Sequence, residues 1–404
     1  MKSFINYLWK NGLVPREKLT SASGEQVEVI ATGQESTTDT FANTRLSIEG
    51  KEVCGTLKLH GAEGTIATEK GEEHTFYINA RPTQETLKEF QEVAAGRHTP
   101  PCEGVAAALS NIKLHDFLTR LLVERIEEKA ARITQIYEAC DKRWDDTLFK
   151  LLARSFGFGI QGRAFEEWAL TLNLQALGKH RDSLEQIEAI MFGQAGLLNQ
   201  ESIPSYYQND ALNSEYYQLL VREYKFLKSK FNLQEMQHSS WGGGNASPHV
   251  RIARLAKLFH SERLGTTAIA SHNTLQELRN TLQVQPGPYW QHHTQFGSTT
   301  TSGLGDLNNK QLDVLIINTV VPMLYSYGKH RHDSNLCNKA EDFLYEISAE
   351  SNSIVRRWTQ QGLCINSAAD SQALIQLNNA YCKMHRCTEC RFAHIYFSNK
   401  LREA

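Results

Sequence analysis

The sequence predicts an α+β protein, with a small N-terminal mixed β domain followed by a large all-α helical region. Between residues 27 and 80 the helical period is absent, and short β-prone segments alternate with Gly and Asn. Beyond residue 110, apolar residues recur at helical spacing with charged residues between them. Pro100-Pro101 separates the two patterns. We therefore expect one domain at residues 1–100 and a second at residues 101–404, which can divide into two sub-bundles near residues 235–250.

The first domain is expected to combine two helices with a small sheet built largely from hairpins. Residues 1–10 are too short and too polar for the apolar core of a secretion signal, and they resemble an amphipathic helix. Arg81-Pro82-Thr83 opens a second short helix. The strands are expected at residues 27–30, 44–48, 53–59 and 75–78.

The second domain is expected to consist of helices that each bury an apolar stripe. The first stripe runs from Leu114 to Tyr137. The longest apolar stretch, around residues 314–321, is interrupted by Asn318-Thr319 and predicts a buried helix, because a membrane span needs about 20 apolar residues. The other helices are expected at residues 148–154, 164–176, 184–191, 215–231, 250–259, 274–282, 311–327, 340–347 and 371–381.

The composition excludes a disordered, fibrous or strongly basic protein. The chain has 404 residues, of which 41% are apolar and 22% are charged, and 43 Lys and Arg side chains stand against 45 Asp and Glu. No overall excess of charge points to nucleic acid or to a membrane surface. Eight Cys without a secretion signal are typical of reduced thiols or metal ligands rather than of a disulfide framework. We expect a cytoplasmic protein with no membrane attachment.

Several segments along the chain carry a similarity to a known family. They are residues 121–129, 152–158, 186–198, 289–290 and 317–322, together with Tyr381-Cys382, Cys387 and Cys390. On these segments the chain resembles an uncharacterised bacterial family, domain of unknown function number 2851. The resemblance spans essentially the whole chain and is strong after residue 110. It implies no established activity.

The N-terminal part of that family carries the patterns Gly-Pro-Asp-Phe, Gly-Asn-Val-Glu-Ile-His and Ser-Asp-Trp, which resemble a PD-(D/E)xK nuclease core. Such a core holds Mg²⁺ between an Asp and a Glu on neighbouring strands. In this chain Thr40 stands at the Asp position, with Asp39 one residue earlier, and Lys58 stands at the Glu position. An ammonium about 4 Å from a divalent ion is repelled by about 8 kcal/mol at an effective dielectric near 20. The resemblance therefore implies a degenerate nuclease core.

A metal site assembled from other residues of this segment is the alternative, with Asp39, His60 and Glu63 as its candidate catalytic residues. The local charge argues against a phosphate-backbone groove, because residues 1–100 hold 11 Lys and Arg against 14 Asp and Glu. We expect no catalytic activity from this domain.

Cys382, Cys387 and Cys390 form the best metal-ligand pattern, because three soft ligands lie within nine residues. On one continuous helix they would share one side of the cylinder. A fourth ligand has to come from elsewhere, and His385 lies nearby. Some of the nuclease families that this resemblance brings in bind an iron-sulfur cluster through one Cys that precedes a long intervening sequence and three Cys that follow it. The resemblance therefore implies Cys102 as the fourth ligand. The cluster predicts either a zinc or iron-sulfur site or a group of reduced, packed thiols.

Two glycine-rich stretches have more than one interpretation. The string Gly157-x-Gly159-x2-Gly162 fits a dinucleotide-binding fingerprint, but an expected helix precedes it where a strand is required. It therefore predicts a helix end, a turn and a new helix. The loop at residues 242–245 leads towards Arg251 and Arg254, and either holds an anion or simply connects two helices.

These observations predict a non-catalytic binding or scaffolding protein of the bacterial cytoplasm, with a protein partner favoured over nucleic acid. A metal-dependent nuclease-like enzyme acting on nucleic acid is one alternative. A protein whose fold is stabilised by zinc or by an iron-sulfur cluster is the other.

Overall fold

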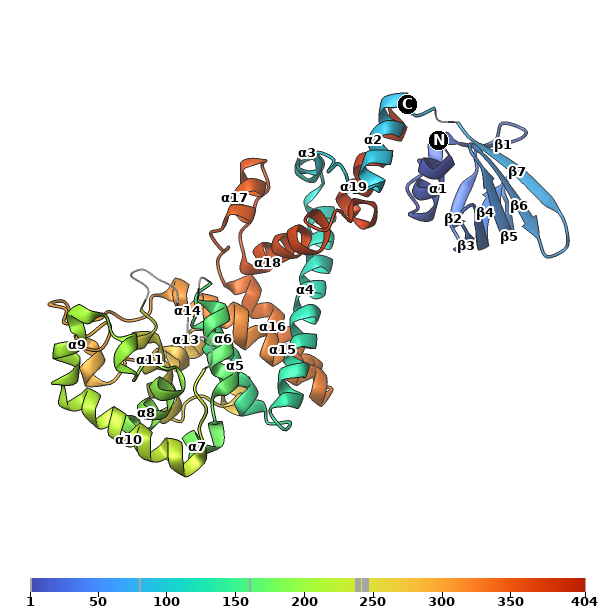
Figure 1. Ribbon diagram of the computed structural model, residues 1–404. Helices are drawn as coiled ribbons and strands as arrows, with labels where there is room; N and C mark the ends of the chain where they lie inside the picture. Colours follow the sequence, from blue (N-terminus) through green and yellow to red (C-terminus); the bar gives the residue numbers. More distant parts are fainter. Residues whose placement is uncertain (1, 80, 160, 237–240, 242–246, 404) are drawn as a thin grey trace. The chain divides into compact units, whose positions relative to one another are not determined.

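The computed structural model describes residues 2–79, 81–159, 161–236, 241 and 247–403 (Figure 1). A curled antiparallel sheet within residues 19–78 precedes a large helical region. The predicted α+β class is therefore confirmed.

Internal contacts divide the chain into two compact units. Unit 1 consists of Met1–Val123, Glu350–Asn366 and Asp370–Ala404, and unit 2 consists of Glu124–Ala349 and Ser367–Ala369. The C-terminal helices thus belong to the same unit as the N-terminal residues. The boundary between the units reflects which segments pack together, and it does not coincide with the change of hydrophobic pattern near residue 100. The expected division near residues 235–250 falls largely on positions outside the described residues.

The sheet in unit 1 has seven strands, and its described pairs are all antiparallel. The strand order is β1-β7-β6-β5-β4-β2, and β3 pairs with β4. Neighbours in the sequence are thus mostly neighbours in the sheet, as the expected hairpins require. The strands are β1 (Leu19–Ser21), β2 (Glu28–Ala31), β3 (Gln34–Thr37), β4 (Thr40–Ile48), β5 (Lys51–His60), β6 (Glu63–Thr68) and β7 (Glu73–Ile78).

Alternation of apolar and polar residues determines which face of the sheet is buried. On β5, Leu57 and Leu59 are fully buried, while Lys58 and His60 are exposed on the opposite face. The same alternation recurs on β4, where Phe41 is buried. The nuclease-like positions on these two strands therefore face away from the core.

Strand β6 is absent from the sequence-based expectation. Apart from Ile66 it consists of small or polar residues, which give little of the usual strand signal. Gly64 lies against the ring of Phe76, and an added Cβ there would lie 2.4 Å from the ring. The position of β6 therefore depends on close packing between Gly64 and Phe76 more than on the β-propensity of its residues.

Helix α1 (Lys2–Lys10) connects the sheet with two other helices of unit 1. Its Trp9 stacks near Phe76 of β7, with ring centroids 5.4 Å apart, and its indole N–H donates to the Thr32 carbonyl. Its Phe4 contacts Phe90 of α2 (Gln84–Ala94) and Phe397 of α19 (Arg391–Arg402). Helices α3 (Cys102–Ala107) and α17 (Ser353–Gln360) also belong to unit 1, together with the first part of α4 (Asn111–Ala139) and most of α18 (Ala368–Gln376).

The remaining helices are mainly those of unit 2. Among the described residues, no helix combines the length and the apolar character that a membrane crossing requires. They are α4 (Asn111–Ala139), α5 (Trp144–Ser155), α6 (Gly162–Thr171), α7 (Leu174–Lys179), α8 (Leu184–Gln194), α9 (Ser205–Leu212), α10 (Glu215–Phe231), α11 (His249–His260), α12 (Thr266–Ser271), α13 (Leu275–Leu282), α14 (Asn309–Leu315), α15 (Val321–Arg331), α16 (Ser334–Glu346) and α18 (Ala368–Gln376).

Two expected helices are interrupted for identifiable reasons. The helix expected at residues 164–176 is divided into α6 and α7, because the Asn173 side chain accepts from the Ala176 N–H and starts a new helix. The helix expected at residues 311–327 contains a π-helical segment, η4 (Ile316–Val320), between α14 and α15. Pro322 has no N–H to donate into the preceding turn, which explains the wider turn before it.

Helices α8 and α10 pack closely at Gly193. A Cβ at this position would lie 2.2 Å from the Tyr224 ring, a distance that ordinary packing does not allow. Glycine is otherwise unfavourable inside a helix by roughly 0.5–1 kcal/mol. Its presence here allows the two helices to approach.

We predict that Gly193→Ala destabilises unit 2 by about 1–3 kcal/mol, because the added methyl group overpacks the contact with Tyr224. Gly178→Ala in α7 is the matched control, since a Cβ there meets nothing within 4 Å. It is expected to be neutral or stabilising by up to about 1 kcal/mol. Thermal unfolding of both variants checks the prediction, which fails if their melting temperatures match.

Candidate functional site

The nuclease-like positions lie together on the exposed face of the sheet. The register of β4 and β5 places Thr40 opposite Lys58. The register of β5 and β6 places His60 opposite Glu63. Because directly opposed residues share a face, Thr40, Lys58, His60 and Glu63 all project from the face opposite the core. Thr40 and Lys58, which stand at the two carboxylate positions of a nuclease core, are therefore neighbours. They carry a hydroxyl and an ammonium group in place of the two carboxylates.

Asp39 precedes β4 and is engaged by a lysine. The Lys2 ammonium lies 2.6 Å from the Asp39 carboxylate, and its hydrogen bond lowers the pKa of Asp39, with a smaller contribution from Lys58. The Asp39 backbone carbonyl accepts from the Leu59 N–H at 2.8 Å. Across the described residues, no group of three or more His, Cys, Asp or Glu side chains could hold a metal ion as arranged. Asp39 thus carries a charge that lysines already compensate.

Four cysteines line one cavity in unit 1. The cavity has a volume of about 290 Å³, and its walls include Cys102, Cys382, Cys387 and Cys390. Each cysteine lies at the end of a local element: Cys102 begins α3, and the other three belong to a π-helical segment, a 3-10 turn and the N-cap of α19. The prediction that Cys382, Cys387 and Cys390 share one face of a helix is therefore wrong. The fold nevertheless brings these three cysteines and Cys102 to one cavity.

Burial favours the protonated form of two thiols of this cavity. Desolvation raises the pKa of Cys390 to about 11 and also raises the pKa of Cys387. A thiol with a raised pKa is a poor nucleophile at neutral pH, because the thiolate is the reactive form. Cys387 and Cys390 are therefore poorly suited to act as nucleophiles. The cavity retains the soft donor atoms that zinc and iron prefer.

Other groups around the cysteines differ in what they can contribute. His385 is exposed and is not part of the cavity wall. The His394 ring contacts the Thr388 carbonyl at 2.9 Å. The Tyr7 hydroxyl is buried without a hydrogen-bond partner, and burial raises its pKa, followed by the effect of Cys390, Cys102 and Cys387. An unpartnered buried hydroxyl beside thiols is an unusual feature of a packed core.

A buried carboxyl in unit 2 was not anticipated as a site residue. Glu188 of α8 is 1% exposed, and the Tyr216 hydroxyl donates to its Oε2 at 2.7 Å. The Trp290 indole donates in turn to the Tyr216 hydroxyl at 2.9 Å, while Oε1 of Glu188 has no partner. Burial raises the pKa of Glu188 to about 8, so the group is a neutral acid at neutral pH. A lone Glu within the apolar run at residues 187–192 was the signal available in the sequence.

The glycine-rich stretch between α5 and α6 behaves as a connection. Helix α5 ends at Ser155 and α6 begins at Gly162, which confirms the predicted helix end, turn and new helix. The loop at residues 242–245 lies outside the described residues. Arg251, which follows it, donates to the Phe156 and Gly157 carbonyls. Arg254 donates to a backbone carbonyl as well, so both guanidinium groups serve the fold.

Comparison with known proteins gives a family and no activity. A family model described as "Protein of unknown function (DUF2851)" matches residues 62–353, well over half of the chain. The chain belongs to this DUF2851 family. No curated protein and no solved structure shows significant similarity to it. The matched segment of this DUF2851 protein begins after Thr40, Lys58 and His60, so the similarity to a nuclease core does not rest on it.

We predict that Glu188 makes stability fall with rising pH. Its pKa is about 8 when folded, against 4.5 for the free group, so its contribution is fully present below pH 4.5 and is lost as the pH rises through 8. Glu188→Gln keeps an acceptor for Tyr216 and removes the titration. We expect the melting temperature of this variant, relative to the natural protein, to rise between pH 5 and pH 9.

Glu201→Gln is the control, because Glu201 is an exposed residue of unit 2 that does not contribute to the pKa shift of Glu188. It should leave the pH dependence of the melting temperature unchanged. Equal pH slopes for the natural protein and Glu188→Gln would contradict the assignment of a neutral buried acid.

Proposed function

We propose that this DUF2851 protein is a non-catalytic binding or scaffolding protein of the bacterial cytoplasm. The observation that carries the proposal is the pairing of Thr40 with Lys58 on β4 and β5, at the two positions where a nuclease-like core requires carboxylates. The nearby carboxylate of Asp39 is held by Lys2 at 2.6 Å. A divalent cation would have to displace this ammonium and approach a second one. The sheet is then a retained scaffold.

A protein partner fits the surface better than nucleic acid. Residues 1–100 carry more acidic than basic side chains, which opposes binding to a phosphate backbone. Tyr206 of α9 and Phe226 of α10 are 73% and 61% exposed, and exposed aromatic side chains are typical of protein contacts. The eight free cysteines suit a reducing compartment, which supports a cytoplasmic location.

A metal-stabilised protein is the second candidate, and the convergence of Cys102 with the three C-terminal cysteines on one cavity favours it. These four thiols would hold zinc or an iron-sulfur cluster, and the metal would supply a cross-link between distant parts of unit 1. A single ion requires the thiols to draw together from their present arrangement, whereas a cluster of several metal atoms spans a wider gap. Since burial raises the pKa of Cys390 to about 11, binding would release protons and strengthen as the pH rises.

We predict that the purified protein does not cleave DNA or RNA in the presence of Mg²⁺ or Mn²⁺. Gel assays on single-stranded and double-stranded substrates check this, with Asp39→Ala and Glu52→Ala tested beside the natural protein. Glu52 is an exposed residue of the same sheet and serves as the control. Cleavage that depends on metal and disappears only in Asp39→Ala would overturn the proposal.

We predict further that protein purified without oxygen contains zinc or iron at about one site per chain. Elemental analysis and the absorption spectrum distinguish the two metals. Cys390→Ser and Cys102→Ser should each lose the metal, and Cys364→Ser should keep it, because Cys364 is an exposed cysteine outside the cavity wall. Metal-free protein with four titratable thiols in the cavity would leave packed thiols as the explanation.

A further inference from the structure

A second cavity lies within unit 2 and is strongly cationic. Its volume is about 490 Å³, within the range of roughly 300–1,000 Å³ typical of small-molecule sites. Four cationic side chains line it, namely Arg125, Lys129, Arg132 and Arg154, against the single carboxylate of Glu128. In a chain whose net charge is only −2, this concentration of positive charge is a local feature.

Three of the cations come from one face of a helix. Arg125, Lys129 and Arg132 are spaced by four and three residues on α4, so they project in the same direction. Like charges at this spacing destabilise a helix by about 0.2–0.5 kcal/mol per pair. Glu128, three residues after Arg125 and four before Arg132, offsets part of this repulsion, and a bound anion would offset more of it.

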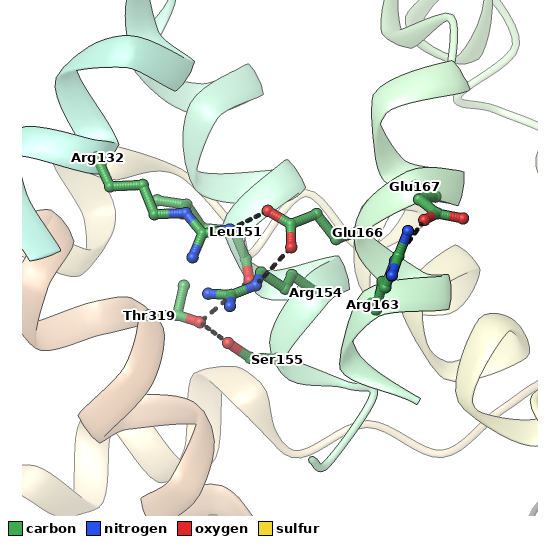
Figure 2. A network of polar contacts seen from close by, with 8 residues as sticks. All are labelled: Arg132, Leu151, Arg154, Ser155, Arg163, Glu166, Glu167 and Thr319. Carbon is green, nitrogen blue, oxygen red and sulfur yellow. Dashed lines mark hydrogen bonds and ion pairs between the residues drawn. The ribbon is translucent and has the colours of Figure 1, made fainter. Parts of the chain in front are cut away.

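A shared carboxylate orients two of the guanidinium groups. Figure 2 shows Glu166 of α6 turned towards Arg132 and Arg154, and both arginines donate to it, Arg154 at 3.0 Å. One carboxylate cannot neutralise two guanidinium groups, and each guanidinium has five N–H donors, so a carboxylate engages only part of it. The two arginine side chains are 44% and 43% exposed. They are thus held in place and also reach solvent.

Polar contacts fix the wall formed by the π-helical segment η4. The Lys129 ammonium contacts the Ile317 carbonyl at 3.3 Å and the Asn318 side-chain oxygen at 3.2 Å, both within the π-helical segment η4. Thr319 of η4 is fully buried and donates to Ser155 of α5 at 2.7 Å (Figure 2). π-Helical turns are frequent at functional sites. Segment η4 therefore holds the Lys129 ammonium at the cavity wall. The hydrogen bond between Thr319 and Ser155 holds η4 against α5.

Small residues leave room at the rim of this cavity. Gly159 and Gly162 both belong to its lining, and a Cβ added to either would meet no protein atom within 4 Å. Gly162 also has an ordinary backbone conformation, so a side chain can be introduced there without strain. The rim is therefore open to a ligand and can be closed by a substitution.

We propose that this cavity binds a small phosphorylated molecule through Arg125, Lys129, Arg132 and Arg154. Arginine matches phosphate oxygens with paired N–H donors, and several cations converging on one cavity suit a group with two or more negative charges. A nucleic acid backbone requires an extended basic groove, while these cations line a single cavity of about 490 Å³. The natural ligand is thus a small molecule that carries two or more phosphate charges.

The test is calorimetric titration of the full chain at low ionic strength with pyrophosphate and with adenosine triphosphate. One saturable site per chain is expected, and its affinity should fall as salt is added. Arg154→Gln and Gly162→Glu should each weaken binding about tenfold or more, the first by removing a charge-assisted hydrogen bond and the second by adding a carboxylate at the rim. Circular dichroism and melting temperature confirm that each variant is folded.

Arg163→Gln is the matched control. Arg163 lies on the same helix as Glu166 but pairs with Glu167 at 2.9 Å, on the other side of α6 and outside the cavity lining (Figure 2). It should leave pyrophosphate binding unchanged. The proposal is overturned if no phosphate probe binds, if Arg163→Gln weakens binding as much as Arg154→Gln, if citrate binds as tightly as pyrophosphate, or if only long nucleic acid binds.

Discussion

Three phenylalanine rings join the two ends of the chain in one core, and the cysteine cavity depends on this contact. Phe4 of α1, Phe90 of α2 and Phe397 of α19 are buried, with ring centroids 5.1–5.9 Å apart in edge-to-face arrangements. Each such pair contributes about 0.5–1.5 kcal/mol beyond the burial of its area. Because α19 is held beside α1 and α2, Cys390 at its start is held near Cys102, which follows α2 in the chain.

Local physical rules predict single elements well and long-range convergence poorly. Thr83 ends the loop before α2 because its hydroxyl accepts from the Thr86 N–H, a cap that the sequence itself indicates. The α+β class follows from such local patterns. No local pattern relates Cys102 to Cys390, since their meeting depends on packing between the two chain ends. The cationic stripe on α4 is visible in the sequence, but its partner Arg154 on α5 becomes relevant only once the two helices face one cavity.

Differences in burial explain why the pKa of one carboxyl group in this protein is lowered and that of another is raised. The Asp39 carboxyl is near the surface beside Lys2, and its pKa is lowered. The Glu188 carboxyl is buried in α8, and its pKa is raised to about 8 although a hydrogen bond from Tyr216 opposes the shift. Burial likewise keeps Cys390 a thiol. An acidic residue or a cysteine in the sequence therefore does not reveal its protonation state, because that state depends on the packing around it.

The cysteine cavity is formed by residues of unit 1 and the cationic cavity by residues of unit 2, so no residue lines both. The segment that matches the DUF2851 family contains the whole cationic wall from Arg125 to Arg154, but of the four cavity cysteines it includes only Cys102. Substitutions in sites that share no partners usually act independently. Loss of thiol chemistry in unit 1 should therefore leave phosphate binding in unit 2 intact. If Cys390→Ser instead altered phosphate affinity, the two units would be coupled by a change of state that both sites influence, since they share no cavity.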